Sequence, residues 1–118
     1  MKKTAVLVTY LLLQFSVCAM GDSRNVVVGV GAGAKCHDFV KLADDPSAKV
    51  LSQVYLSYAQ GWFSALNSNA KPTMRSVGGT LTSDELFHFL ALQCQAAPEI
   101  AYFTAVDALY ERLGKAGL

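Results

Sequence analysis

The chain has 118 residues, of which 53% are hydrophobic, and ten Lys and Arg side chains against nine Asp and Glu. This length allows one domain. The formal net charge is +1, and the chain has no run of Lys or Arg. It therefore lacks the basic surface that is typical of nucleic-acid-binding proteins. It also has no polybasic segment that would attract it to an anionic membrane.

The first nineteen residues have the layout of a secretory signal peptide. Lys2 and Lys3 precede an apolar run over residues 5–15, and small residues before position 20 predict cleavage after Ala19. Two alternatives stay open: a membrane anchor, for which the run is short, and a lipoprotein acylated at Cys18, for which Val17 fits poorly. We therefore expect an exported, periplasmic protein without stable membrane association after cleavage.

Cleavage leaves two cysteines, Cys36 and Cys94, which are expected to form one disulfide in an oxidising compartment. They are 58 positions apart, and closing a loop of this length stabilises a fold by about 4 kcal/mol in the chain-entropy model. Loss of Lys2 and Lys3 leaves eight basic and nine acidic side chains, a net charge of −1.

The mature chain is predicted to begin with a mobile arm over residues 20–33, followed by a helical domain over residues 34–118. Valines in the arm favour an extended chain while glycines weaken it, so a short edge strand is the other interpretation. The glycines do not follow a phosphate-loop pattern. The first helix is predicted over residues 34–43, with Cys36 and Phe39 facing the core. It ends before Pro46, which disfavours helix in the residue before it.

The central helix is predicted over residues 48–67, with Ser47 as its N-cap. Two apolar stripes at helical spacing predict that other elements wrap this helix. Gly61 costs about 1 kcal/mol relative to Ala in a helix, which predicts close approach of another backbone. The two stripes are Leu51, Tyr55, Tyr58, Trp62 and Leu66, and Leu56, Ala59 and Phe63.

Residues 67–80 are predicted to form a loop by their composition. A loop this long in a helical domain is expected to be either functional or disordered. Lys71, Met74 and Arg75 make it the first candidate for a partner-specific surface, with a plain connector as the alternative.

The third helix is predicted to start after Thr82, which forms a capping box with Glu85. Asp84 and Glu85 are therefore interpreted as helix caps rather than catalytic carboxylates. The fourth helix is predicted to start at Pro98 and to end at Gly114 and Gly117. The inward residues of these two helices are predicted to be Leu86, Phe87, Leu90, Cys94, Ile100, Phe103, Val106, Tyr110 and Leu113.

No residue pattern indicates an active site, so we predict no catalytic residue, metal or cofactor. A zinc site from Cys36, His37, His88 and Cys94 lacks CxxC or HxxxH spacing, and neighbouring helical residues point about 100° apart. A cysteine nucleophile conflicts with the disulfide. A Ser/His/Asp set stays open, although no GxSxG elbow is present. An enzyme or ligand carrier would need a pocket lined by His37 or His88, and Asp44-Asp45 offers few oxygen ligands for calcium.

The order of these features resembles the HdeA/HdeB-like periplasmic proteins and the related immunity proteins that neutralise amidase effectors of type VI secretion. The likeness covers roughly residues 36–113 and is carried by Cys36-x-x-Phe39, Gly61-Trp62 in the central helix, and Cys94-x-x-x-Pro98. It implies a small all-α four-helix bundle with a disulfide joining Cys36 and Cys94. For the acid chaperones it implies a folded, often dimeric state that acid loosens, so that apolar surface becomes exposed.

We therefore expect a non-enzymatic protein that acts by protein–protein interaction, with self-association into a homodimer as a further expectation. The first function is an acid-stress holdase for unfolding clients. Acid moves the mature charge from about −1 to about +10, and this repulsion loosens compact states. The alternative is an immunity or inhibitor protein that binds a secreted cell-wall amidase. The expected interaction residues are Tyr55, Tyr58, Trp62, Phe63, Lys71, Met74 and Arg75.

Overall fold

Four α-helices and one 3₁₀ turn make up the described part of the chain. The computed structural model describes residue 30 and residues 33–118, so the predicted signal peptide and most of the predicted arm lie outside the described residues. The elements are α2 (Cys36–Ala43), η2 (Pro46–Ala48), α3 (Lys49–Asn69), α4 (Ser83–Ala96) and α5 (Tyr102–Ala116). The prediction of an all-α four-helix fold with a Cys36–Cys94 disulfide is confirmed.

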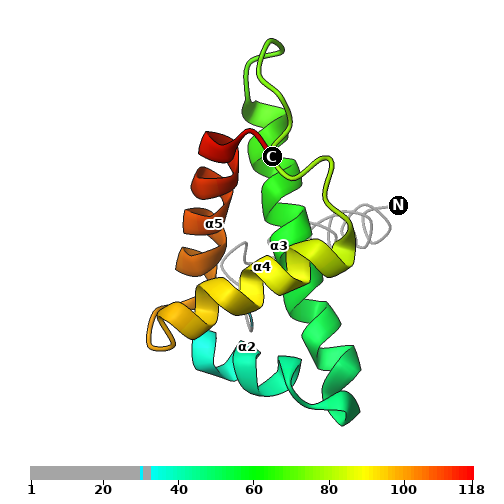
Figure 1. Ribbon diagram of the computed structural model, residues 1–118, viewed down its shortest axis with the longest axis vertical. Coiled ribbons are helices and arrows are strands. Elements are labelled where there is room, and N and C mark those ends of the chain that lie inside the picture. Colours follow the sequence, from blue (N-terminus) through cyan, green and yellow to red (C-terminus); the bar gives the residue numbers. More distant parts are fainter. Residues whose placement is uncertain (1–29, 31–32) are drawn as a thin grey trace, which may run out of the picture.

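The other helices pack against one side of α3, the long helix that runs through the molecule in Figure 1. α5 lies beside α3 and runs in the same direction, α4 crosses over α3, and α2 lies near the start of α3 (Figure 1). All four helices contribute to one apolar core. Its buried residues are Cys36, Phe39, Leu56, Ala59, Phe63, Leu86, Leu90, Cys94, Tyr102, Ala105, Val106, Leu109 and Leu113.

The start of α2 is tied to the turn between α4 and α5. The disulfide joins Cys36, the first residue of α2, to Cys94 near the end of α4, and both cysteines are buried. The Cys36 N–H donates to the Ile100 carbonyl at 2.9 Å, and the Tyr102 N–H donates to the Ala34 carbonyl at 2.9 Å. One covalent bond and a set of backbone hydrogen bonds therefore hold α2, α4 and α5 together at this end.

The prediction that Ser47 caps the central helix is wrong. The N-cap of α3 is Ala48, which has no side-chain cap. Asp45 caps the preceding turn η2 instead, because its side chain accepts hydrogen bonds from the N–H and the hydroxyl of Ser47 at 2.9 Å and 2.7 Å. Pro46 suits the first position of the turn that follows, because its φ is preset and it lacks an N–H. η2 therefore forms first, and α3 starts two residues after Ser47.

The fourth helix starts at Tyr102 rather than at the predicted Pro98. The carbonyl of Pro98 accepts a hydrogen bond from the N–H of His37 at 2.9 Å, so this segment bonds to α2 instead of starting a helix. Two other signals are confirmed. Thr82 and Glu85 form the capping box of α4, and Gly117 ends α5 at a φ of 77°, in the left-handed region that favours glycine.

α3 is covered on one side, so the prediction that other elements wrap it is wrong. Its buried residues are Ser52, Leu56, Ala59 and Phe63, whereas Leu51 and Trp62 of the other stripe are exposed. Gly61 has no atom within 4 Å of the place where a Cβ would stand, so the predicted close approach of a backbone is absent there. Phe103, predicted to point inward, is also exposed.

Candidate functional site

Large apolar side chains gather at the surface where α3 and α5 run side by side. We define the α3–α5 face by Leu51, Val54, Tyr58, Trp62 and Phe103. Val54 is 50% exposed, Phe103 45% and Trp62 38%. On α3 these residues follow one another at helical spacing, and Phe103 lies one turn before Asp107, whose side chain bonds to Trp62. The face is therefore continuous from one helix to the other.

Trp62 and Asp107 connect the two helices within this face. The Trp62 Nε1–H donates to the Asp107 Oδ1 at 3.2 Å. The Tyr58 ring lies nearly parallel to the Trp62 ring, with an interplanar angle of 9° and a centroid separation of 6.5 Å. Burial, with the negative charge of Asp107 as a second cause, raises the pKa of the Tyr58 hydroxyl. One carboxylate and two aromatic rings therefore meet at the surface.

Two of the predicted interaction aromatics belong to the core instead. Phe63 is 4% exposed and packs edge-on against Tyr110, with ring centroids 5.1 Å apart. The half-buried Tyr55 stacks on Phe39 at 5.4 Å, and its carbonyl accepts a hydrogen bond from the Tyr102 hydroxyl at 2.8 Å. Burial, followed by the charge of Asp38, raises the pKa of Tyr55. Tyr58 and Trp62 are thus the predicted aromatics that lie on the face.

The loop between α3 and α4 projects beyond the end of α3 (Figure 1). Its base is held by Asn67, which the sequence analysis did not single out. The Asn67 Nδ2–H donates to the Val77 carbonyl at 3.0 Å, and the Asn67 Oδ1 accepts from the Val77 N–H at 3.0 Å and from the Tyr110 hydroxyl at 2.9 Å. An Asn at a helix end before a Gly-containing loop was the available signal, since such residues often bond loop backbone.

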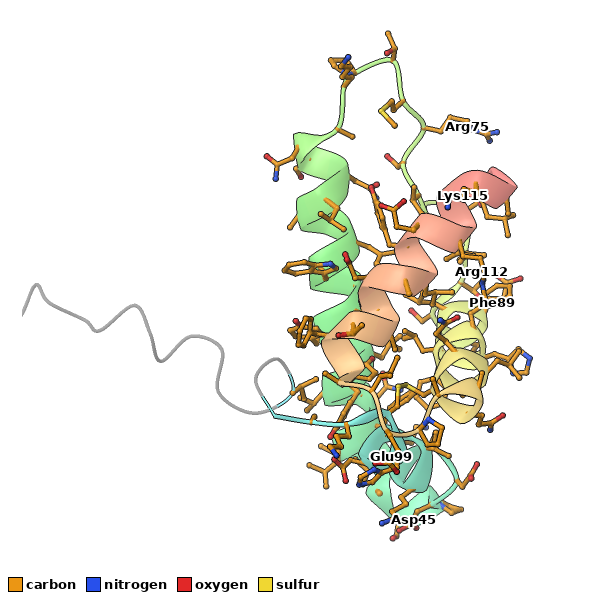
Figure 2. All side chains as sticks on the ribbon, turned by 90° about the vertical axis from the view of Figure 1, so that its left-hand side faces the viewer. Asp45, Arg75, Phe89, Glu99, Arg112 and Lys115 are labelled. Atoms are coloured by element: carbon orange, nitrogen blue, oxygen red, sulfur yellow. A yellow bond between two sulfur atoms is a disulfide. The ribbon has the colours of Figure 1, made fainter. Side chains whose placement is uncertain are left out.

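The three predicted loop residues lie in the projecting part of this loop. Lys71, Met74 and Arg75 are exposed, Met74 by 64%. Met74 and Arg75 line a groove of about 380 Å³ between the loop and α5, together with Lys115. In Figure 2, Arg75 and Arg112 lie to the right of α5, whereas α3 lies to its left. The groove shares no residue with the α3–α5 face, so the two are described as separate surfaces.

The two histidines do not complete a metal-binding cluster in the described part of the chain. His37 is partly exposed, with its Nε2 3.0 Å from the Asp38 Oδ1, and His88 lines an open groove with Phe89. Cys36 and Cys94, which the zinc alternative requires, are bonded to each other. Among residues 33–118 there is no group of three His, Cys, Asp or Glu placed to hold a metal ion. Nor is any helix there long and apolar enough to cross a membrane.

Comparisons of the chain with protein-family models, with curated proteins and with solved structures found no match. The likeness to HdeA-like proteins therefore stays a prediction from the sequence. The function has to be argued from the two surfaces described above.

Proposed function

We propose that this is an exported, non-enzymatic protein that binds other proteins through the α3–α5 face. The observation that carries the proposal is a row of large, exposed apolar side chains across two neighbouring helices. Apolar patches of this kind on small proteins typically mark interaction sites. Export by the signal peptide to the periplasm is part of the proposal, with anchoring as a lipoprotein at Cys18 as its alternative form.

As the finer function we propose acid-stress holdase activity like that of the HdeA-like proteins. Hydrogen bonds from the Thr82 N–H and hydroxyl keep the pKa of Glu85 low, and bonds from Ser47 do the same for Asp45. A carboxylate with a lowered folded-state pKa stabilises the fold above its unfolded pKa and loses that contribution as pH falls. Acid therefore weakens both caps while positive charge accumulates, and the disulfide keeps the opened chain tethered.

An acid titration tests this finer function. Oxidised mature protein is taken from pH 7 to pH 2 while Trp62 fluorescence, molecular size and suppression of client aggregation are recorded together; Trp62 is the only tryptophan in the chain. We expect the fold to open and client aggregation to be suppressed in the same pH range. A protein that stays closed and does not affect client aggregation would exclude holdase activity.

The second candidate is inhibition of a secreted cell-wall amidase through the projecting loop. Asn67 holds the base of this loop, and Met74 and Arg75 are exposed. These observations favour the second candidate, because a loop that is already held in place loses little conformational entropy on binding. An amidase encoded beside the gene is assayed with the wild type, with the Met74→Ala/Arg75→Glu variant, and with Lys41→Glu as an exposed control on α2. We expect only the loop variant to lose inhibition. Absence of amidase inhibition by the wild type and by both variants would rule this function out.

A further inference from the structure

Asp107 is an exposed carboxylate next to Trp62, at one end of the α3–α5 face. α3 has no charged residue after Lys49, so it brings no charge to the part of the face around Asp107. Within residues 33–118, no Lys, Arg or His nitrogen lies within ion-pair distance of Asp107. Within the part of the chain that the structure describes, its one side-chain hydrogen bond, from Trp62, uses a single acceptor site of a carboxylate that has about four. Asp107 can therefore accept hydrogen bonds from a second group.

The two aromatic rings beside Asp107 restrict which group fits. Tyr58 and Trp62 are nearly parallel and partly exposed, and the charge of Asp107 contributes to the raised pKa of Tyr58, so the carboxylate lies close to both residues. A cation within about 6 Å of an aromatic centroid is attracted to the ring face, most strongly to that of Trp. The Trp62 N–H points along the ring plane, so Asp107 lies at the edge of the indole. A group that pairs with Asp107 would therefore lie next to these rings, within reach of their faces.

Among protein cations, a guanidinium suits this combination better than an ammonium. It is planar, stacks on aromatic rings, pairs with a carboxylate through two parallel hydrogen bonds, and is less strongly hydrated. Val54 and Phe103, further along the same face, are exposed and offer apolar contact to its neighbours in a partner chain. The protein's own Arg112 and Lys115 make no ion pair with Asp107, so within the described residues they do not fill this position.

We propose that Asp107, Tyr58 and Trp62 bind an arginine side chain of the partner protein. The guanidinium pairs with Asp107 and reaches the faces of the aromatic rings, while apolar residues next to the arginine pack on Val54 and Phe103. This inference rests on the proposed function of the α3–α5 face and adds the chemistry of the segment that the face selects: one arginine among apolar residues.

Peptide titrations at pH 7 test the inference, with Trp62 fluorescence as the readout in the oxidised full-length mature protein. The probe is acetyl-Ala-Leu-Arg-Leu-Ala-amide, and the matched peptides carry citrulline or lysine in place of arginine. Citrulline keeps the shape but removes the charge. We expect saturable binding of the arginine peptide, with affinity about tenfold higher than for the citrulline peptide and several-fold higher than for the lysine peptide.

Two variants distinguish the effect of the Asp107 carboxylate from that of another acidic residue on α5. Asp107→Asn keeps an acceptor for the Trp62 N–H but removes the charge, and we expect it to bind the arginine peptide about tenfold more weakly. Glu111→Gln, one turn further along α5, is expected to bind like the wild type. Circular dichroism confirms that both variants fold.

Equal affinity for the arginine and citrulline peptides would overturn the inference and leave an apolar binding face intact. Equal affinity for arginine and lysine would overturn the choice of a guanidinium, and unchanged binding by Asp107→Asn would overturn the role of Asp107. Absence of any peptide binding in a protein that suppresses client aggregation would also overturn the inference, without affecting the proposed function.

Discussion

At the scale of single residues, Tyr102 ties the start of α5 to α3. Its ring is buried among Phe39, Tyr55 and Tyr58, with centroid separations of 5.2, 4.9 and 6.0 Å. Burial, followed by the neighbouring tyrosines, raises the pKa of the Tyr102 hydroxyl far above its usual range. The hydroxyl therefore stays protonated and serves as a hydrogen-bond donor to the Tyr55 carbonyl.

Replacing this donor should destabilise the protein measurably. We expect Tyr102→Phe to lower the free energy of unfolding by about 1 kcal/mol, the net value of one internal hydrogen bond, and the melting temperature by about 4–8 °C. Thermal unfolding followed by circular dichroism measures both. Tyr58→Phe is the control, since the Tyr58 hydroxyl makes no hydrogen bond within the described residues. Equal melting temperatures for the two variants would contradict the role given to Tyr102.

Asn67 is expected to hold the loop between α3 and α4 in place. Asn67→Ala removes three hydrogen bonds between α3, the loop and α5, which we expect to cost about 2 kcal/mol. The Val77 amide should then exchange its hydrogen much faster, as hydrogen-exchange measurements would show. Asn69→Ala, which removes only an exposed bond to the Ala65 carbonyl, is expected to leave Val77 protected. Similar exchange in both variants would mean that Asn67 does not anchor the loop.

Residue by residue, the sequence predicted the binding surface only in part. Helical spacing identifies which side chains share a face, and it placed Tyr58 and Trp62 together. It does not tell which of two apolar stripes the other helices will cover, so Phe63 was assigned to the surface although it is buried. Phe103 and Asp107 were missed because they join the face through the packing of α5 on α3, a contact between distant parts of the sequence.

At the scale of elements, the start of α4 depends on the charge of Glu85. The Glu85 Oε2 accepts from the Thr82 N–H at 2.7 Å, and the Thr82 hydroxyl accepts from the Glu85 N–H at 3.2 Å. These bonds hold the pKa of Glu85 below its ordinary value of 4.5. The sign follows from the lowered pKa: the cap contributes stability above about pH 4.5 and loses it below, as Glu85 takes up its proton.

The pH dependence of unfolding should therefore change when the charge of Glu85 is removed. Between pH 7 and pH 3, we expect Glu85→Gln to lose less stability than the wild type, because glutamine has no carboxylate to take up a proton in this range. Chemical denaturation at the two pH values measures this difference. Asp84→Asn, in the same helical turn, should keep the pH dependence of the wild type. A Glu85→Gln variant with the pH dependence of the wild type would show that the capping box is not acid-sensitive.

Helix boundaries were predictable where the signal is local. The capping box and Gly117 act within a few residues of the helix ends, so the sequence placed both correctly. Proline is also a local signal for a helix start, yet α5 does not start at Pro98. The Pro98 carbonyl instead accepts a hydrogen bond from the N–H of His37 in α2. The spacing of the residues cannot reveal such a hydrogen bond to a helix that is distant in the sequence.

At the scale of the whole molecule, the disulfide should carry a large share of the stability. Both cysteines are buried, and the bond closes a loop with a sequence separation of 58. We expect the Cys36→Ser/Cys94→Ser variant to lose about 4 kcal/mol of unfolding free energy, much of what a small domain has. Chemical denaturation with and without a reducing agent measures the loss. The variant should be insensitive to the reducing agent. A wild type whose stability does not change on reduction would contradict this prediction.

The most direct test of protein binding by the α3–α5 face is suppression of client aggregation by Val54→Lys, compared with Leu92→Lys. Val54 lies on the face at 50% exposure and Leu92 on α4 at 46%, and lysine stays charged throughout the acid range. We expect that Val54→Lys no longer suppresses client aggregation, whereas Leu92→Lys acts like the wild type. Full suppression by Val54→Lys, or equal loss in both variants, would contradict binding through the α3–α5 face.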